Sequence, residues 1–175
     1  MAKVNLSTGA PLRGAKRWAF LERAETIRVA TVVADDPIHV SPLWFVTKDQ
    51  KIYLPFDQAS RHMRAIENGG RLSAVVDKGD EFATVHGVAI EGGARRVDDE
   101  ALAAELSRLV LEKYFLFGHP YLVEYINMGE YYGRLWYEIT VDKMIGWDMR
   151  EATALPTLEK RRLPQHMIAA HPVAG

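Results

Sequence analysis

The chain has 175 residues, 48% of them hydrophobic and 26% charged, which are ordinary values for a single globular domain with a substantial core. Its formal net charge of −1 excludes a whole-protein field that would gather nucleic acid or an anionic membrane, so any basic site must be local. Cysteine is absent, which excludes disulfides, thiolate nucleophiles and cysteine-bound metal clusters.

The two ends of the chain differ from its middle. Residues 1–14 are small and polar and contain no apolar signal region, so they predict a flexible N-terminal arm. Residues 15–151 carry the patterned segments of one folded domain, and residues 152–175 form a proline-punctuated, irregular tail. No apolar stretch approaches the ~18 residues of a membrane span, so we expect a soluble, cytoplasmic protein with no membrane partner.

In the first half of the domain, a helix is expected over residues 15–24, followed by strands over 27–34, 38–47 and 51–56. The turn signals between these strands are short, which predicts an antiparallel meander. Lys51–Phe56 alternates with Ile52, Leu54 and Phe56 on one buried face. A short helix is then expected over 61–68, capped by Ser60 and ended by Gly69-Gly70.

The second half continues with strands over 72–76 and 82–97, and Gly92-Gly93 predicts a bulge or sharp bend in the second of these. A helix is expected over 101–117, residues 121–132 are ambiguous and compatible with a helix, and strands follow over 134–141 and 144–149. About seven strands that are mostly adjacent in sequence favour a closed antiparallel sheet, because closure removes open edges. The fold class is therefore mainly β with a few helices, arranged as a small barrel.

The start of the short helix gathers Ser60, Arg61, His62 and Arg64. Unpaired backbone N–H groups and the helix dipole favour an anion there, and a guanidinium can bind phosphate through two parallel hydrogen bonds. A solvated basic helix face is an equally good interpretation of this spacing.

The order of the motifs resembles the pyridoxamine-phosphate-oxidase-like flavin-binding split barrels, including the branch that binds the deazaflavin coenzyme F-420. The resemblance covers about residues 16–151, and the stretches that carry it are WAFLERAETIRVATV, HVSPLWFV, KIYLPF, ASRHMRAIENGGRLSAVVD, GVAIEGGARRVDD and RLWYEITVDKMIGWDMRE.

The resemblance implies an antiparallel Greek-key split β-barrel of the FMN-binding type. It also implies a homodimer with two cofactor sites in the grooves between subunits. The residues that match the family's cofactor contacts are Val40, Ser41, Pro42 and Leu43 beside the isoalloxazine, Pro55 and Phe56 near the ribityl chain, Ser60, Arg61 and His62 at the phosphate, and Trp147 from the second subunit. Many members carry lysine where this chain has His62, and a histidine is only partly charged near neutrality, so phosphate binding is expected to depend on pH.

Several side chains keep more than one interpretation. Trp44 and Phe45 are adjacent on a strand and face opposite ways, so one should be core and the other could wall the cofactor site. The aromatic group at 114–121 is expected at an interface or lid, with a substrate pocket as the alternative; it consists of Tyr114, Phe115, Phe117 and Tyr121. The six histidines show no metal-ligand spacing, so no metal site is expected.

No side chain is identified as a catalytic acid, base or nucleophile. That fits a flavoprotein, in which the cofactor ring carries the electron chemistry and the protein binds and orients it. The sequence therefore favours an FMN-dependent oxidoreductase that transfers a hydride to or from an unknown small-molecule substrate.

Three alternatives remain open. Coenzyme F-420 would need a longer basic track, for which the candidates are Arg61, Arg64, Arg71, Arg95 and Arg96. A non-catalytic flavin or haem carrier, or a regulatory module, is possible on the same barrel. A single-strand nucleic-acid barrel needs basic grooves with interleaved aromatics, and the net charge of −1 argues against it, so no nucleic-acid partner is expected.

Overall fold

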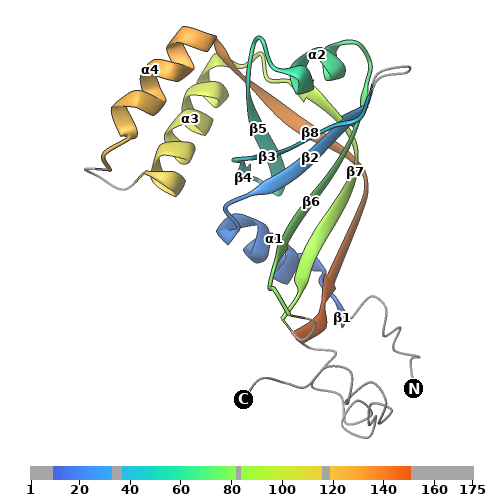
Figure 1. Cartoon of the computed structure of the whole chain (residues 1–175). Coiled ribbons are helices and arrows are strands. Elements are labelled where there is room, and N and C mark those ends of the chain that lie inside the picture. Colours follow the sequence, from blue (N-terminus) through green and yellow to red (C-terminus); the bar gives the residue numbers. More distant parts are fainter. Residues whose placement is uncertain (1–9, 33–36, 82–83, 116–118, 151–175) are drawn as a thin grey trace, which may run out of the picture.

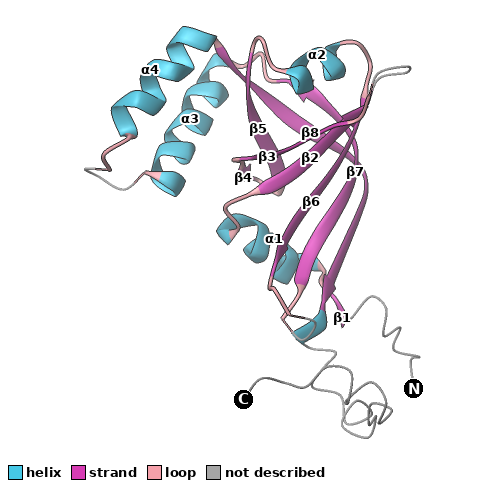
Figure 2. Ribbon diagram, in the orientation of Figure 1, coloured by secondary structure: helices cyan, strands magenta, loops and turns pink. Residues whose placement is uncertain are grey.

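A computed structural model describes residues 10–32, 37–81, 84–115 and 119–150, so most of the expected arm and the whole tail lie outside the described residues. Figure 1 shows a strongly curved sheet with helices around it, and Figure 2 separates the strands from the helices by colour. The elements are β1 (Ala10–Pro11), α1 (Gly14–Arg23), β2 (Ile27–Val32), β3 (His39–Leu43), β4 (Val46–Lys48), β5 (Lys51–Asp57), α2 (Arg61–Glu67), β6 (Arg71–Lys78), β7 (His86–Arg96), α3 (Glu100–Tyr114), α4 (Leu122–Tyr132) and β8 (Arg134–Asp148).

The strands form one antiparallel sheet in the order β3-β2-β6-β7-β8-β5-β4, and β1 pairs with β8 at the end of that strand. The first and last strands in this order, β3 and β4, are consecutive in the chain and are joined by Trp44 and Phe45 alone. The sheet therefore curls until its two ends meet at one bend. The predicted mainly-β, antiparallel split barrel is confirmed.

The expected meander over residues 27–56 is wrong in one respect, because residues 38–47 form two strands rather than one. β3 pairs with β2, whereas β4 pairs only with β5 at the opposite end of the sheet. The cause lies at Phe45, whose backbone N–H and carbonyl both lie within hydrogen-bonding distance of the Tyr114 hydroxyl instead of a neighbouring strand.

The last two expected strands are also one, because β8 runs unbroken for 15 residues. Its pairing with β7 shifts register between Glu91 and Gly92, so Asp142 is the extra residue on the β8 side. A Cβ atom at Gly92 would collide with the Thr140 carbonyl oxygen. The bulge predicted from the glycine pair is thus confirmed, and it lets the long β7–β8 ladder bend without breaking.

The sheet has a core on each face. Inside the curve, Leu21 of α1 and Met63 and Ile66 of α2 pack with the inward strand residues, including the predicted Ile52, Leu54 and Phe56. Outside it, Leu106 and Val110 of α3 pack on a second group that consists of Val46, Tyr53 and Trp136. Strand β5 lies between both cores, which explains why three consecutive residues, Ile52, Tyr53 and Leu54, are buried.

Three expectations concern the remaining segments. The ambiguous residues 121–132 do form a helix, α4, which lies beside α3 beyond the end of the sheet (Figure 1). Ala10–Pro11, within the expected arm, pairs with β8, so this part of the arm is attached to the barrel. In the portion that the structure describes, none of the helices has the length and apolar character that a membrane crossing requires.

Candidate functional site

Helix α2 presents two different faces. Arg61, Arg64, Ala65 and Asn68 follow the i, i+3, i+4, i+7 spacing of one stripe, and this stripe lines a groove of about 290 Å³ together with His39, which we call the arginine groove. Ser60 caps the helix, and its hydroxyl accepts a hydrogen bond from the backbone N–H of Met63 at 3.1 Å. The hydroxyl predicted to contact phosphate is therefore already engaged with the helix itself.

The arginine groove is locally positive. Among the described residues, Arg61 and Arg64 make no ion pair and no side-chain hydrogen bond, and both are exposed. The other three members of the possible basic track each pair with a carboxylate: Arg71 with Asp142, Arg95 with Glu138 and Arg96 with Asp98. Of the five arginines of the possible basic track, Arg61 and Arg64 are thus the two without a carboxylate partner among the described residues.

His62 does not line the arginine groove and is only 2% exposed, and its ring lies 4.5 Å from that of His39, which does line it. Its Nδ1 lies 3.0 Å from Thr31 Oγ1, its Nε2 lies 2.6 Å from Ser41 Oγ, and its ring packs against Phe56. Burial, with smaller effects from the charges of His39 and Arg61, lowers the pKa of His62 to about 4. We therefore revise the expectation for His62, which is a neutral link between β2, β3 and α2 rather than a charged phosphate ligand.

Strand β3 carries four of the predicted cofactor residues and ends the sheet, so in the described part of the chain its edge away from β2 pairs with no strand. Val40 and Pro42 share its exposed side, with Val40 60% exposed. Ser41 and Leu43 share the other, and Ser41 is turned toward His62. Pro42 has no N–H, so any free donor on this edge comes from another residue of β3.

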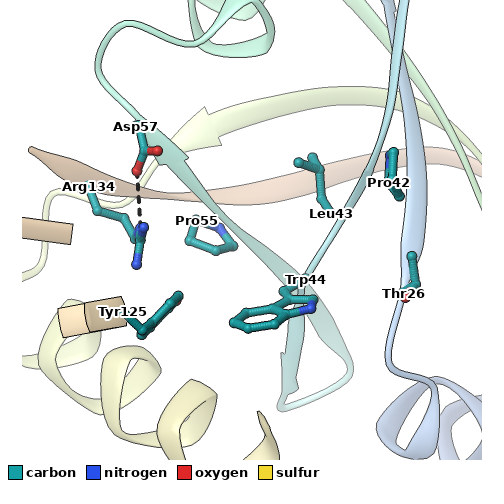
Figure 3. Close-up of a pocket in the computed structure, with 8 residues that line it drawn as sticks. All are labelled: Thr26, Pro42, Leu43, Trp44, Pro55, Asp57, Tyr125 and Arg134. Carbon is teal, nitrogen blue, oxygen red and sulfur yellow. Dashed lines mark hydrogen bonds and ion pairs between the residues drawn. The ribbon is translucent and has the colours of Figure 1, made fainter. Parts of the chain in front are cut away.

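A second groove, of about 340 Å³, lies at the far end of β3, and we call it the tryptophan groove (Figure 3). It brings together the ends of β3 and β5, the start of β8 and one side of α4. Its lining residues are Thr26, Pro42, Leu43, Trp44, Pro55, Asp57, Tyr125 and Arg134. Of the predicted pair on β5, Pro55 therefore faces this groove, whereas the Phe56 side chain is 2% exposed and belongs to the barrel core.

The alternatives left open for Trp44 and Phe45 are now distinguished. Phe45 is fully buried in the core, and Trp44 is 39% exposed in the groove. The indole of Trp44 stacks on Tyr114, with ring centroids 4.6 Å apart and planes 10° from parallel, and it also contacts Phe115 and Tyr125. The aromatic group of α3 and α4 thus supports one wall of the tryptophan groove, and Phe117 lies outside the described residues.

Four residues of this groove were not predicted from the sequence: Thr26, Asp57, Tyr125 and Arg134. Arg134 donates from Nε to Asp57 Oδ1 at 3.1 Å, and its guanidinium carbon lies 4.4 Å from the centre of the Tyr125 ring. The pairing of β5 with β8 places Asp57 directly opposite Arg134. No local motif marks these residues, because the register of two strands 77 positions apart brings them together.

Trp147 lies at the opposite end of β8 from Arg134, paired with Gly87 and Pro11. Its indole covers Gly87, where a Cβ atom would come within 2.8 Å of the ring. A single chain therefore does not bring Trp147 to the other predicted residues. In the described ranges, no cluster of three or more histidine, aspartate or glutamate side chains has metal-binding geometry.

Comparison with known proteins gives one family. The model of the family described as pyridoxamine 5'-phosphate oxidase matches residues 15–146. A search among curated proteins found no match.

Solved structures share the fold across most of the chain. A conserved hypothetical protein from Mycobacterium tuberculosis has 24% sequence identity and a TM-score of 0.69, covering 89% of this chain and 94% of its own. An FAD-binding protein from Mycobacterium smegmatis has 20% identity and a TM-score of 0.55, covering 78% and 95%. A haem storage protein from Vibrio cholerae has 14% identity and a TM-score of 0.60, covering 76% and 94%.

Proposed function

The chain belongs to the pyridoxamine 5'-phosphate oxidase family, and from this premise we propose that it is an FMN-dependent oxidoreductase acting on a small-molecule substrate. The observation that carries this proposal is the pair of exposed arginines, Arg61 and Arg64, on one stripe of α2 beside the unpaired edge of β3. The two arginines suit the phosphate of FMN, and the unpaired strand edge suits its ring.

The chain's residues fit the cofactor in three parts. Arg61 and Arg64 are the candidates for the phosphate, because two uncompensated guanidiniums in one groove favour a dianion. The strand between the arginine groove at His39 and the tryptophan groove at Leu43 spans roughly 13 Å at ~3.3 Å per residue. The ribityl chain of FMN together with part of its ring would cover this interval, with Pro42, Leu43 and Pro55 beside the ring.

The protein's own contribution is binding and orientation. Bound FMN supplies the ring that accepts and donates a hydride. Backbone N–H groups on the free edge of β3 would donate to the pyrimidine edge of that ring and stabilise negative charge on it. The apolar side chains of the tryptophan groove would exclude water from its face.

FMN is favoured over coenzyme F-420 by the state of the other arginines. F-420 continues into a phosphodiester and an acidic tail, which needs a long series of available cations. Because Arg71, Arg95 and Arg96 are paired with carboxylates, the uncompensated positive charge of the possible track is limited to Arg61 and Arg64. The visible spectrum of the purified protein separates the two cofactors, since flavin and deazaflavin absorb at different wavelengths.

The substitution Arg61→Ala tests the phosphate assignment. Loss of a charge-assisted, bidentate contact should weaken FMN binding by about 1.5–3 kcal/mol without unfolding the protein. The measurement is the FMN dissociation constant by fluorescence titration, with Arg71→Ala as the matched control because Arg71 is already paired with Asp142. An FMN affinity that is the same in wild type and Arg61→Ala would remove the assignment.

A carrier without catalysis is the second candidate, and one structural relative is a haem storage protein. Such a carrier would bind its ligand tightly but would not oxidise or reduce any substrate. Anaerobic reduction of the bound flavin by a panel of pyridine nucleotides and small alcohols separates the two candidates, because only the oxidoreductase should bleach the flavin at a catalytic rate.

A further inference from the structure

The tryptophan groove has one flat aromatic wall. Trp44 forms one wall, and its plane is fixed by stacking on Tyr114, so the wall cannot fold away without breaking that contact. The Tyr125 ring lies 5.3 Å from that of Trp44 and is tilted by 43° from it, so it lines the groove at an angle to this wall. Aromatic walls of this kind favour planar, apolar ligands, because offset stacking and water exclusion both contribute to binding.

Arg134 is a cation that lines the tryptophan groove. The side chain of Arg134 is only 17% exposed, which makes it much more buried than the other paired arginines, and it lines the groove. Its one recorded ion pair, with Asp57, uses Nε and a single carboxylate oxygen. A guanidinium has five N–H donors. Asp57 and the Tyr125 hydroxyl occupy part of this capacity, and the remaining donors are left for another acceptor.

The position of this cation is built into helix α4. Gly129 lies inside the helix, where glycine is less favourable than alanine. A Cβ atom at this position would lie 3.1 Å from Nη1 of Arg134. The glycine therefore makes room for the guanidinium, which lies over the Tyr125 ring and is held there by Asp57.

We propose that the tryptophan groove binds a planar, apolar compound that carries a carboxylate, with its ring against Trp44 and its carboxylate on Arg134. This inference rests on the proposed function, because the flavin ring would occupy the part of the groove at Pro42, Leu43 and Pro55. The compound would be the substrate beside that ring, at Trp44 and Arg134. Asp57 is the internal competitor: its carboxylate already shares the guanidinium and repels a second anion, so it weakens binding while it keeps Arg134 in place.

Benzoate and its neutral analogue benzamide test the proposal. The two probes have the same ring and similar size, so their difference isolates the carboxylate. Each is titrated into the protein as purified, and the dissociation constant is measured by ligand-observed NMR. Wild type should bind benzoate several-fold more tightly than benzamide.

Two substitutions should change the affinity for benzoate in opposite directions. Arg134→Gln should weaken benzoate at least about tenfold and leave benzamide nearly unchanged, as expected for loss of a charge-assisted contact. Asp57→Asn should tighten benzoate several-fold, because it removes the competing anion but keeps an acceptor for Nε. Arg95→Gln is the matched control, since Arg95 is an exposed arginine paired with Glu138 outside the groove.

Equal affinity for the two probes in wild type, or no tightening by Asp57→Asn, would overturn the proposal. The Asp57→Asn result decides the matter even where Arg134→Gln fails to fold. Flavin content is measured by absorbance in the same samples. Arg134-dependent benzoate binding to protein that takes up no flavin would refute the oxidoreductase and keep the anion site, whereas flavin-loaded protein that does not distinguish the probes would refute the anion site alone.

Discussion

His62 illustrates how one turn of helix can hold residues with opposite tasks. It follows Arg61 directly, yet a helix rotates by about 100° per residue, so the two side chains leave α2 on different sides. Arg61 faces the groove, and His62 joins Thr31 and Ser41 inside the fold. The imidazole is therefore a structural hydrogen-bonding group between three elements.

This burial predicts a pH dependence of stability. An unfolded histidine has a pKa near 6.5, above the value of about 4 for His62 in the fold, so the unfolded chain binds more protons between these pH values. Stability that is fully present above pH 6.5 should fall as the pH drops toward 4. In His62→Gln this part of the decline should become shallower, by up to about 1.4 kcal/mol per pH unit.

Urea denaturation of wild type and variant across that pH range measures the effect. The groups that face His62 are His39, Arg61, Thr31 and Ser41, and all are kept in the variant. His119→Gln, at an exposed histidine, is the matched control. Identical pH profiles for wild type and His62→Gln would contradict the assignment of the proton uptake to this residue.

The inward direction of His62 could have been predicted from the sequence. Met63 and Ile66 mark the buried face of α2, and His62 lies four residues before Ile66 on that same face. Arg134 is a different case, because its proximity to Asp57 and Gly129 depends on the register of β8 against β5 and on where α4 ends. Local patterns carry no information about such long-range register.

At the scale of elements, helix α3 fastens the bend between β3 and β4. Tyr114 accepts a hydrogen bond from the Phe45 backbone N–H at 3.0 Å, and the carbonyls of Phe45 and Glu25 each lie 2.8 Å from its hydroxyl. Lys113 donates to the Phe45 carbonyl at 3.0 Å and lies over the Phe45 ring, and burial lowers the pKa of Lys113 to about 8. The end of one helix thus replaces the strand partner that Phe45 lacks.

Removal of the Tyr114 hydroxyl should therefore loosen this bend. Tyr114→Phe leaves the buried Phe45 N–H without its acceptor, which should cost about 1–3 kcal/mol of stability. Chemical denaturation measures the total effect, and faster amide hydrogen exchange at Phe45 and Val46 would locate it. Tyr131→Phe is the control, because that side chain is 82% exposed and should change stability by less than about 0.5 kcal/mol. A Tyr114→Phe variant as stable as this control would refute the fastening role.

Elements with a strong local signal were predicted well. The alternation of β5, the acidic start of α3 and the glycine pair of β7 each follow from period, cap or bulge chemistry in the sequence. The bend at Trp44 and Phe45 was not predicted, because an apolar run from β3 into β4 has the composition of one strand. Its cause is a hydroxyl about 70 residues away, at Tyr114.

At the scale of the whole molecule, the predicted homodimer would complete the cofactor site. Apolar side chains remain exposed beside the free strand edge, including Ile38 and Val40, and near the Trp147 end of the barrel, where Ile145 is exposed. Because Trp147 lies at the other end of β8 from Arg134, it can join the proposed FMN site only from a second copy of the chain. Both observations support a dimer in which the Trp147 end of each subunit lies at the β3 edge of the other.

A mixed dimer tests this arrangement. Arg61→Ala and Trp147→Ala should each weaken FMN binding when present in both subunits. A heterodimer is then purified through two different tags, with Arg61→Ala in one subunit and Trp147→Ala in the other. Both substitutions fall into one of its two sites, so the other site should have wild-type affinity for FMN. Titration with FMN would then show one tight and one weak site. A heterodimer with no tight site, or a protein that sediments as a monomer, would contradict the shared site.

The way in which the barrel closes has a consequence for where ligands can enter. In a fully closed barrel, the first and last strands are zipped together by hydrogen bonds. Here Trp44 and Phe45 join β3 to β4, but β3 and β4 do not pair with each other. Among the described residues, the outer edge of β3 therefore has no strand partner. The two grooves lie at the two ends of β3. We therefore expect a long, flat ligand to approach the barrel along the outer edge of β3, where backbone groups have no strand partner.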